Sequence, residues 1–198
     1  MKFSSRIDSA IRLASRLHRD QTRVDAGRSP YISHLASVAM ILSEVTEDED
    51  IIISGLMHDS LEDVEGYTYE KLVADCGKKV AYIVSFVTES NSLNTGTPMS
   101  WMTRKEGYLK KLKEGGKESA LVSAADGIHN LSNYILQTKE NGQEFLKKFE
   151  NSSDKNRIWF NEERIKVIEE KLGSDHVLVN EFKKIAKEFK DLVGETDK

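Results

Sequence analysis

The chain has 198 residues, of which 38% are hydrophobic and 31% are charged, and its formal net charge is −4. This length supports one sizeable hydrophobic core, and the weakly acidic balance gives no support for generic nucleic-acid or membrane binding. A single cysteine, Cys76, excludes an intrachain disulfide and a thiolate metal site. No apolar run reaches the length that spans a bilayer, and the N-terminus does not read as a signal peptide. We therefore expect a cytoplasmic protein with one domain over residues 1–198 and a frayed tail at 190–198.

Apolar residues recur at helical spacing along most of the chain, and the whole sequence contains only two prolines. Both features favour an all-α protein. In chain order, the pattern predicts helices over 3–19, 30–45, 51–65, 68–77, 78–88, 101–113 and 117–138, a short helix reaching 149, a helix over 157–172 and a last helix ending near Val193. The most loop-like stretch, residues 89–100, is long enough in a compact domain to be functional or mobile.

The stretch IIISGLMHDSLED, residues 51–63, combines an apolar face with four titratable residues near its end, His58, Asp59, Glu62 and Asp63. His58 and Glu62 are four positions apart, as are Asp59 and Asp63, so on one helix each pair would be neighbours. Burying three carboxylates without a cation is costly. A bound divalent metal ion would remove that cost.

Two further polar residues lie among apolar neighbours, His34 in ISHLASVAMI and Asp126 in LVSAADGIHNL. Together with His58 and Asp59 they make a set of two histidines and two carboxylates drawn from three helices. Such ligands suit Mn²⁺, Fe²⁺ or Zn²⁺ and leave positions open for water and substrate. Each residue alone has a simpler interpretation, since His34 could be a hydrogen-bonded core histidine and Asp126 could pair with a nearby lysine.

The order of these residues resembles the HD-domain metal-dependent phosphohydrolases, and in particular the RelA/SpoT-type (p)ppGpp hydrolase domains and the small alarmone hydrolases. The resemblance runs from about residue 6 to 137. The motifs that carry it are HRDQTR at 18–23, PYISH at 30–34, LMHDSLED at 56–63, VT at 87–88, RK at 104–105 and ADGIHN at 125–130. It implies an all-α HD-domain helical bundle of roughly eight to ten helices.

The resemblance also implies a role for each polar residue. The ligands of one metal ion, Mn²⁺ in the first place, would be His34, His58, Asp59 and Asp126. Glu62 and Asp63 would position and deprotonate a metal-bound water, in keeping with general-base catalysis at a metal site. The substrate contacts would come from Arg23, Asn130 and Lys105. The loop at 89–100 would border this pocket.

Three positions depart from the small alarmone hydrolases. Val24 and Gly127 stand where a basic residue is common, and Phe160 falls near a pocket tyrosine of that family. Arg28 can replace the charge missing at Val24, and a close approach of backbone or ligand would explain Gly127. These departures remove phosphate-binding groups but no metal-binding or water-activating residue.

The leading hypothesis is a metal-dependent phosphohydrolase acting on a nucleotide, with the 3′-pyrophosphate of (p)ppGpp as first candidate. A small-molecule nucleotide is the partner implied, and the oligomeric state stays open. One alternative is an HD-type nucleotidase or NADPH phosphatase, which the missing basic residues favour. Another is a non-catalytic, metal-stabilised nucleotide-binding module. Glu62 and Asp63 argue against the module, because a structural metal site does not need them.

Overall fold

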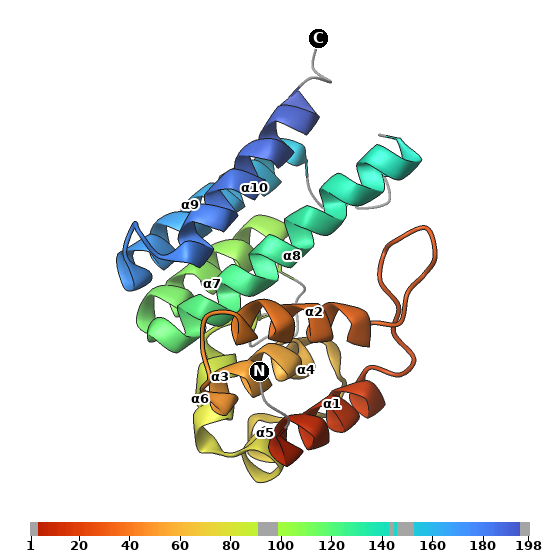
Figure 1. The fold of residues 1–198 in the computed structure, drawn as a ribbon, viewed down its shortest axis with the longest axis vertical. Coiled ribbons are helices and arrows are strands. Elements are labelled where there is room, and N and C mark those ends of the chain that lie inside the picture. Colours follow the sequence, from red (N-terminus) through yellow and green to blue (C-terminus); the bar gives the residue numbers. More distant parts are fainter. Residues whose placement is uncertain (1–3, 91–98, 143–144, 146–152, 195–198) are drawn as a thin grey trace.

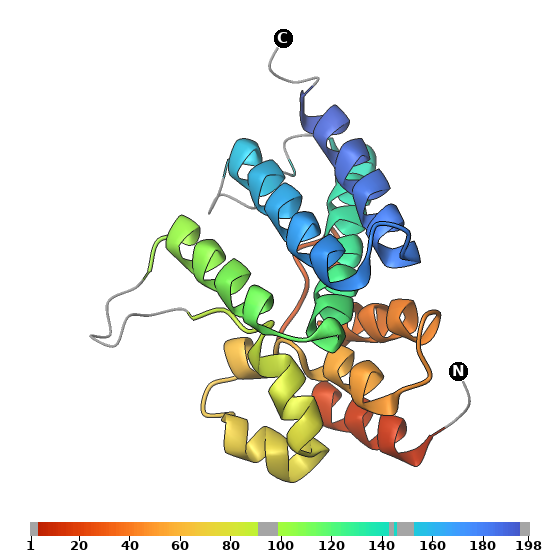
Figure 2. The same ribbon diagram turned by 90° about the vertical axis from the view of Figure 1, so that its left-hand side faces the viewer.

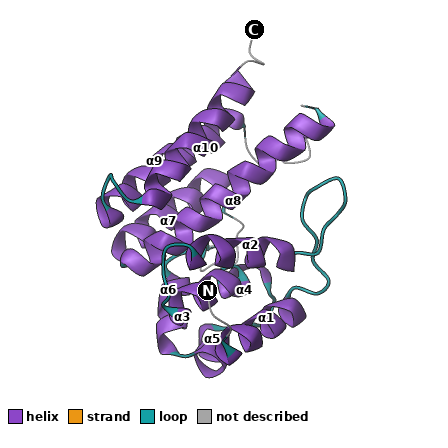
Figure 3. Cartoon of the chain, viewed as in Figure 1, coloured by secondary structure: helices purple, strands orange, loops and turns teal. Residues whose placement is uncertain are grey.

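The computed structural model describes residues 4–90, 99–142, 145 and 153–194. Within these residues the regular elements are all α-helices, ten in number (Figure 3). The all-α prediction is therefore confirmed, and the number of helices lies within the expected range. None of the helices in this part of the chain is long and apolar enough to cross a membrane.

The first six helices form the lower half of Figure 1. They are α1 (Ser5–Leu17), α2 (Ile32–Ser43), α3 (Glu49–Met57), α4 (Ser60–Asp63), α5 (Tyr69–Cys76) and α6 (Lys78–Ser85). Helices α2 and α3 pack closely because Gly55 has no side chain; a Cβ there would lie 2.5 Å from Cδ1 of Leu42. This contact brings the end of α3 against α2.

The sequence predicted one continuous helix over residues 51–65. The structure interrupts it at residues 58–59, so the prediction of a continuous helix was wrong there. Helix α3 ends at Met57, and the single-turn helix α4 starts at Ser60. Two side chains take up carbonyl groups at the break: Nδ1 of His58 lies 2.8 Å from the carbonyl of Gly55, and the hydroxyl of Ser60 donates to the carbonyl of Met57 at 2.6 Å. Side chains that bond to nearby backbone in this way compete with the helical pattern.

The remaining helices form the upper half of Figure 1. They are α7 (Trp101–Glu114), α8 (Lys117–Asn141), α9 (Asp154–Leu172) and α10 (Val177–Gly194). Helix α8 packs against α2 and α3 on one side and against α9 and α10 on the other (Figures 1 and 2). Residues 190–194, which we expected in the frayed tail, instead continue α10, where Val193 is buried. The short helix predicted to reach 149 and the loop residues 91–98 lie outside the described residues.

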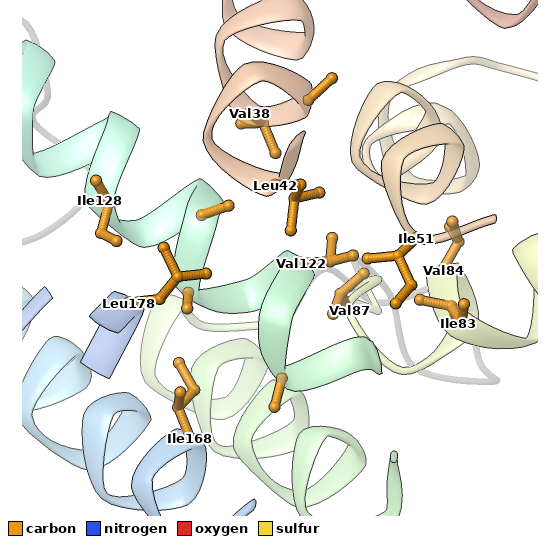
Figure 4. Close-up of a cluster of buried hydrophobic side chains, with 14 of the residues drawn as sticks. Val38, Leu42, Ile51, Ile83, Val84, Val87, Val122, Ile128, Ile168 and Leu178 are labelled. Carbon is orange, nitrogen blue, oxygen red and sulfur yellow. The ribbon is translucent and has the colours of Figure 1, made fainter. Parts of the chain in front are cut away.

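The hydrophobic core continues from one half to the other (Figure 4). Its buried members come from both halves and include Val38, Leu42, Ile51, Ile83, Val84, Val87, Val122, Ile128, Ile168 and Leu178. Helix α8 contributes to this core along much of its length. The polar residues of α8 that are discussed below are therefore held on a helix that is packed on both sides.

Gly127 of α8 lies against Phe182 of α10. A Cβ at this position would lie 2.2 Å from Cζ of Phe182, whose ring is fully buried. The close neighbour is an aromatic side chain of α10, and not the backbone or ligand that we expected. A long basic side chain would not fit at this position, so packing explains why glycine stands there.

Candidate metal centre and its cavity

The four residues predicted to bind metal meet where α2, the break between α3 and α4, and α8 come together. The Nε2 atoms of His34 and His58 are 3.3 Å apart. Oδ1 of Asp126 lies 3.3 Å from the first nitrogen and 3.5 Å from the second. Oδ2 of Asp59 lies 3.5 Å and 3.2 Å from the same two atoms. The ligand atoms of His34, His58 and Asp126 all lie within 4.8 Å of one another, so these three could hold a metal ion, with Asp59 adjoining them.

The charges at this centre favour a cation. Burial opposes a charge on His58, yet the carboxylates of Asp59 and Asp126 outweigh burial and raise its pKa well above the usual value. Burial likewise opposes ionisation of Asp126, but Arg164 and the two histidines hold its pKa well below the usual range. For Asp59, burial is overcome by His58 and His34, which also lower its pKa. Two ionised carboxylates and two imidazoles in one buried volume fit a divalent ion that accepts nitrogen and oxygen ligands.

Each of the two histidine rings at the centre is oriented by a contact to its Nδ1 atom, on the side away from the centre. Nδ1 of His58 lies 2.8 Å from the carbonyl of Gly55 and donates to it, so Nε2 is the nitrogen that faces the centre. A metal ion bound there would replace the Nε2 proton that Asp59 and Asp126 favour. Nδ1 of His34 lies 2.8 Å from Nδ1 of His129. Burial, followed by the charges of His34 and Arg23, lowers the pKa of His129 to about 4, so His129 is neutral near pH 7. When His34 donates to His129, its Nε2 is also free to bind metal.

Tyr31, His129, Arg164 and Glu89 also contribute to the site, and the sequence analysis assigned a role to none of them. The Tyr31 hydroxyl lies 2.7 Å from Oδ2 of Asp59 and 3.3 Å from Oδ2 of Asp63. A sequence signal existed for three of the four. Tyr31 stands inside PYISH, His129 directly precedes Asn130, and Glu89 begins the loop that was expected to border the pocket. Arg164 lies outside the matched motifs and had no such signal.

The two residues predicted to be catalytic, Glu62 and Asp63, both line a cavity of about 320 Å³ that includes the four metal-binding candidates. Oε2 of Glu62 accepts a hydrogen bond from the backbone N–H of Glu89 at 3.0 Å. Burial, followed by the charges of Glu89 and Asp59, raises the pKa of Glu62 to about 7. Asp63 is more exposed, and partial desolvation together with Asp59 raises its pKa as well. A carboxylate with a pKa near 7 suits a general base.

The three predicted substrate contacts also line this cavity. Nη2 of Arg23 donates to Oδ1 of Asn130 at 2.8 Å, and Nδ2 of Asn130 donates to Oδ1 of Asp126 at 2.6 Å. Lys105 is ion-paired with Glu89, and its Nζ lies 4.6 Å from the centre of the Phe160 ring.

Arg28, which we considered as a source of the positive charge missing at Val24, does not line the cavity. Arg28 is exposed and is not among the residues that line the cavity, whereas Val24 itself lines it. Of the loop at 89–100, Glu89 lines the cavity, while residues 91–98 are not described. The expectation that the loop borders the pocket thus holds at its first residue and stays a prediction for the rest.

Fold and site together define an all-α protein with a buried centre of histidine and aspartate side chains at the base of a polar cavity. A sequence model of the HD domain family matches residues 10–151. The chain therefore belongs to the HD domain family, as its motifs led us to expect, and hydrolases of this family bind a divalent metal.

Among curated proteins, the chain is 33% identical over 132 residues to the guanosine-3′,5′-bis(diphosphate) 3′-pyrophosphohydrolase MESH1 of Danio rerio, covering 66% of this chain and 69% of that protein. It is 32% identical over 136 residues to a GTP pyrophosphokinase of Streptomyces coelicolor, covering 68% of this chain. That match covers only 16% of the GTP pyrophosphokinase, so the chain spans about a sixth of that protein's length.

Two solved structures share the fold. One is described as a metazoan ortholog of SpoT that hydrolyses ppGpp; it has a TM-score of 0.75 and 22% identity, and the match covers 95% of this chain and 97% of that one. The other is lmo0812 of Listeria monocytogenes, with a TM-score of 0.67, 26% identity, and coverage of 78% of this chain and 96% of that one. Both confirm the HD-domain helical architecture.

Proposed function

We propose that this protein is a metal-dependent phosphohydrolase that removes the 3′-diphosphate of ppGpp and leaves GDP and pyrophosphate. The observation that carries the proposal is one cavity holding both the cluster of His34, His58, Asp59 and Asp126 and the Glu62 carboxyl with its pKa near 7. The name of the Danio rerio relative supports this choice of substrate.

The metal of this enzyme is Mn²⁺, held by His34, His58, Asp59 and Asp126. Two imidazole nitrogens and two carboxylate oxygens suit Mn²⁺ and leave room for further ligands. When bound, the ion supplies Lewis-acid activation of the phosphoryl group and lowers the pKa of water. Asp59 is the fourth ligand in this assignment, and the Tyr31 hydroxyl that donates to its Oδ2 holds it in place.

Glu62 accepts the proton of the attacking water. Its raised pKa lets it take up that proton near neutral pH, and the backbone N–H of Glu89 fixes the orientation of its carboxyl group. Asp63 is exposed, lines the same cavity and shares the Tyr31 hydroxyl with Asp59, so it helps to orient the same water.

Arg23, Asn130 and Lys105 bind the nucleotide. Arg23 can present its guanidinium fork to a phosphate group, while Lys105 offers a single charge that Glu89 already shares. The aromatic rings of Trp101, Tyr134 and Phe160 also line the cavity and give a base a surface on which to stack.

A second candidate is a nucleoside 5′-monophosphatase or an NADPH phosphatase with the same centre. It is favoured by the pairing of Lys105 with Glu89 and by the uncharged Val24 on the cavity wall, which together lower the positive charge available to a substrate. A less highly charged substrate would suit such a cavity.

The deciding experiment incubates the purified chain and Mn²⁺ with ppGpp, GMP or NADPH and separates the products by anion-exchange chromatography. GDP and pyrophosphate from ppGpp are the expected result. Phosphate from GMP or NADPH alone would favour the second candidate. Binding of ppGpp without turnover of any compound would indicate a nucleotide-binding module instead.

The metal assignment is tested by elemental analysis of the wild type and the Asp126→Ala variant. We expect one ion per chain in the wild type and a loss of most of it in Asp126→Ala. Equal metal content in both proteins would refute the assignment of Asp126 as a ligand.

A further inference from the structure

Arg164 of α9 places a buried guanidinium directly behind the metal centre. Its side chain is only 4% exposed. Nε donates to the hydroxyl of Ser123 at 2.8 Å, and Nη2 donates both to Oδ2 of Asp126 at 2.8 Å and to the backbone carbonyl of Ser123. Residue 164 lies beyond the segment 10–151 that the HD domain family matches.

The guanidinium is held in this position by aromatic rings as well as by hydrogen bonds. Cζ of Arg164 lies 5.3 Å from the centre of the Tyr108 ring and 5.7 Å from those of Phe160 and Phe182. The Tyr108 hydroxyl also hydrogen bonds with the hydroxyl of Ser123 at 2.8 Å. Because arginine stays protonated in proteins, this is a permanent positive charge with a fixed direction.

The two carboxylate oxygens of Asp126 therefore have different partners. Oδ1 faces Nε2 of His34 and of His58 and accepts from Asn130. Oδ2 is occupied by Arg164. The carboxylate cannot turn its second oxygen toward the ion without breaking a charge-assisted hydrogen bond, which is stronger than a neutral one.

We propose that Arg164 is a positioning residue of the metal centre, which holds the Asp126 carboxylate turned so that Oδ1 alone is offered to the ion. This inference rests on the proposed metal function. The charge of a divalent ion would be balanced by the carboxylates of Asp59 and Asp126. The Arg164 guanidinium would therefore not be repelled by a net positive centre, and its nearest charged group is Oδ2 of Asp126. Outer groups that orient metal ligands in this way commonly account for a 10- to 100-fold change in metal affinity, as an order of magnitude.

The test measures binding of Mn²⁺ alone to the metal-free protein, by the electron paramagnetic resonance signal of the free ion. Arg164→Gln, which removes the charge and the fork, is expected to weaken Mn²⁺ binding by roughly 10- to 100-fold. Arg164→Lys keeps the charge but loses the planar fork, so we expect it to recover part of the affinity.

Two matched controls on α9 separate positioning from general effects. Arg157→Gln removes another guanidinium that lines the cavity and pairs with Asp154, and it should leave Mn²⁺ affinity within about twofold of the wild type. Ile165→Ala removes a buried apolar side chain next to Arg164 and should lower the melting temperature without changing Mn²⁺ affinity at a temperature where the variant is folded.

Wild-type affinity in Arg164→Gln would overturn the inference, as would tighter binding or an equal loss in Ile165→Ala. If Arg164→Gln does not fold, Ser123→Ala is the substitute, because it removes the hydroxyl that accepts from Nε of Arg164 and bonds with Tyr108. The Mn²⁺ affinity of Ser123→Ala should fall by a few-fold. An unchanged Mn²⁺ affinity would contradict the positioning role. A wild-type chain that binds no Mn²⁺ would overturn the proposed metal function itself, and the inference with it.

Discussion

The Nη2 group of Arg23 donates a hydrogen bond to Oδ1 of Asn130 at 2.8 Å, across 107 positions of sequence. Asn130 in turn donates to Oδ1 of Asp126. Asn130 therefore links Arg23 to Asp126, one of the candidate metal ligands. Among the described residues, the buried Nε of Arg23 has no hydrogen-bond partner.

Removing the guanidinium of Arg23 should affect substrate binding more than chemistry. We expect Arg23→Ala to raise KM by about 10-fold or more, as for the loss of a charge-assisted hydrogen bond, while kcat changes by only a few-fold. Steady-state kinetics with ppGpp measure both quantities. Arg28→Ala serves as the control, because Arg28 lies in the same loop but not on the cavity wall. A fall in kcat with KM unchanged would place Arg23 in the chemical step.

Replacing Glu62 by glutamine keeps the size and the hydrogen-bonding capacity of the side chain but removes the base. Glu62→Gln should retain metal and fold, bind substrate within a few-fold, and lose turnover by on the order of 10²-fold or more. Asp63→Asn should lose less activity, since Asp63 is the more exposed of the two. The two losses should not add if the carboxylates act as one unit. Loss of metal in Glu62→Gln would make Glu62 a ligand.

Removing the negative charge of Glu89 should change the pH dependence of the reaction, because that charge raises the pKa of Glu62. Burial is the largest cause of the raised pKa of Glu62, and the charge of Glu89 is the next. A general base works when deprotonated, so activity rises with pH through its pKa. Removing the charge in Glu89→Gln lowers that pKa, so the acidic limb of the kcat/KM profile should move to lower pH. An unmoved limb would show that another group titrates there.

The close contact between Gly127 and Phe182 makes a prediction about stability. Gly127→Ala should lower the free energy of unfolding by about 1–3 kcal/mol, because the new Cβ meets the Phe182 ring. The cost should be smaller in a Phe182→Leu background, which a double-mutant cycle by urea unfolding measures. Gly107→Ala on α7 is the control; none of the described residues has an atom within 4 Å of its Cβ position, so alanine should be neutral or stabilising there.

The helices and the convergence of the candidate metal ligands could be predicted because both leave local traces. Apolar periodicity marks a helix, and His34, His58 and Asp126 stand out as polar residues among apolar neighbours. The break after Met57 could not be predicted, because it depends on the hydrogen bonds that the side chains of His58 and Ser60 make to nearby carbonyl groups.

The partners of the predicted residues were harder to foresee than the residues themselves. Arg164 lies 38 positions from Asp126, and Glu89 lies 27 positions from Glu62. Neither stands in a motif. Arg164 reaches the site only through the packing of α9, and Glu89 only through the course of the chain after α6. Lys105 shows the same effect, because Glu89 and Phe160 convert an ordinary helix-face lysine into a partly buried one.

The candidate ligands lie on α2, at the α3–α4 break and on α8, and α8 also carries α9 and α10. An ion at this point ties the first six helices to the helix on which the rest of the chain is packed. Without the ion, only the shared core and the packing of α8 against α2 and α3 join the two halves at this point. With the ion bound, local opening at the centre requires its release, so slow exchange of amide hydrogens should extend across both halves together.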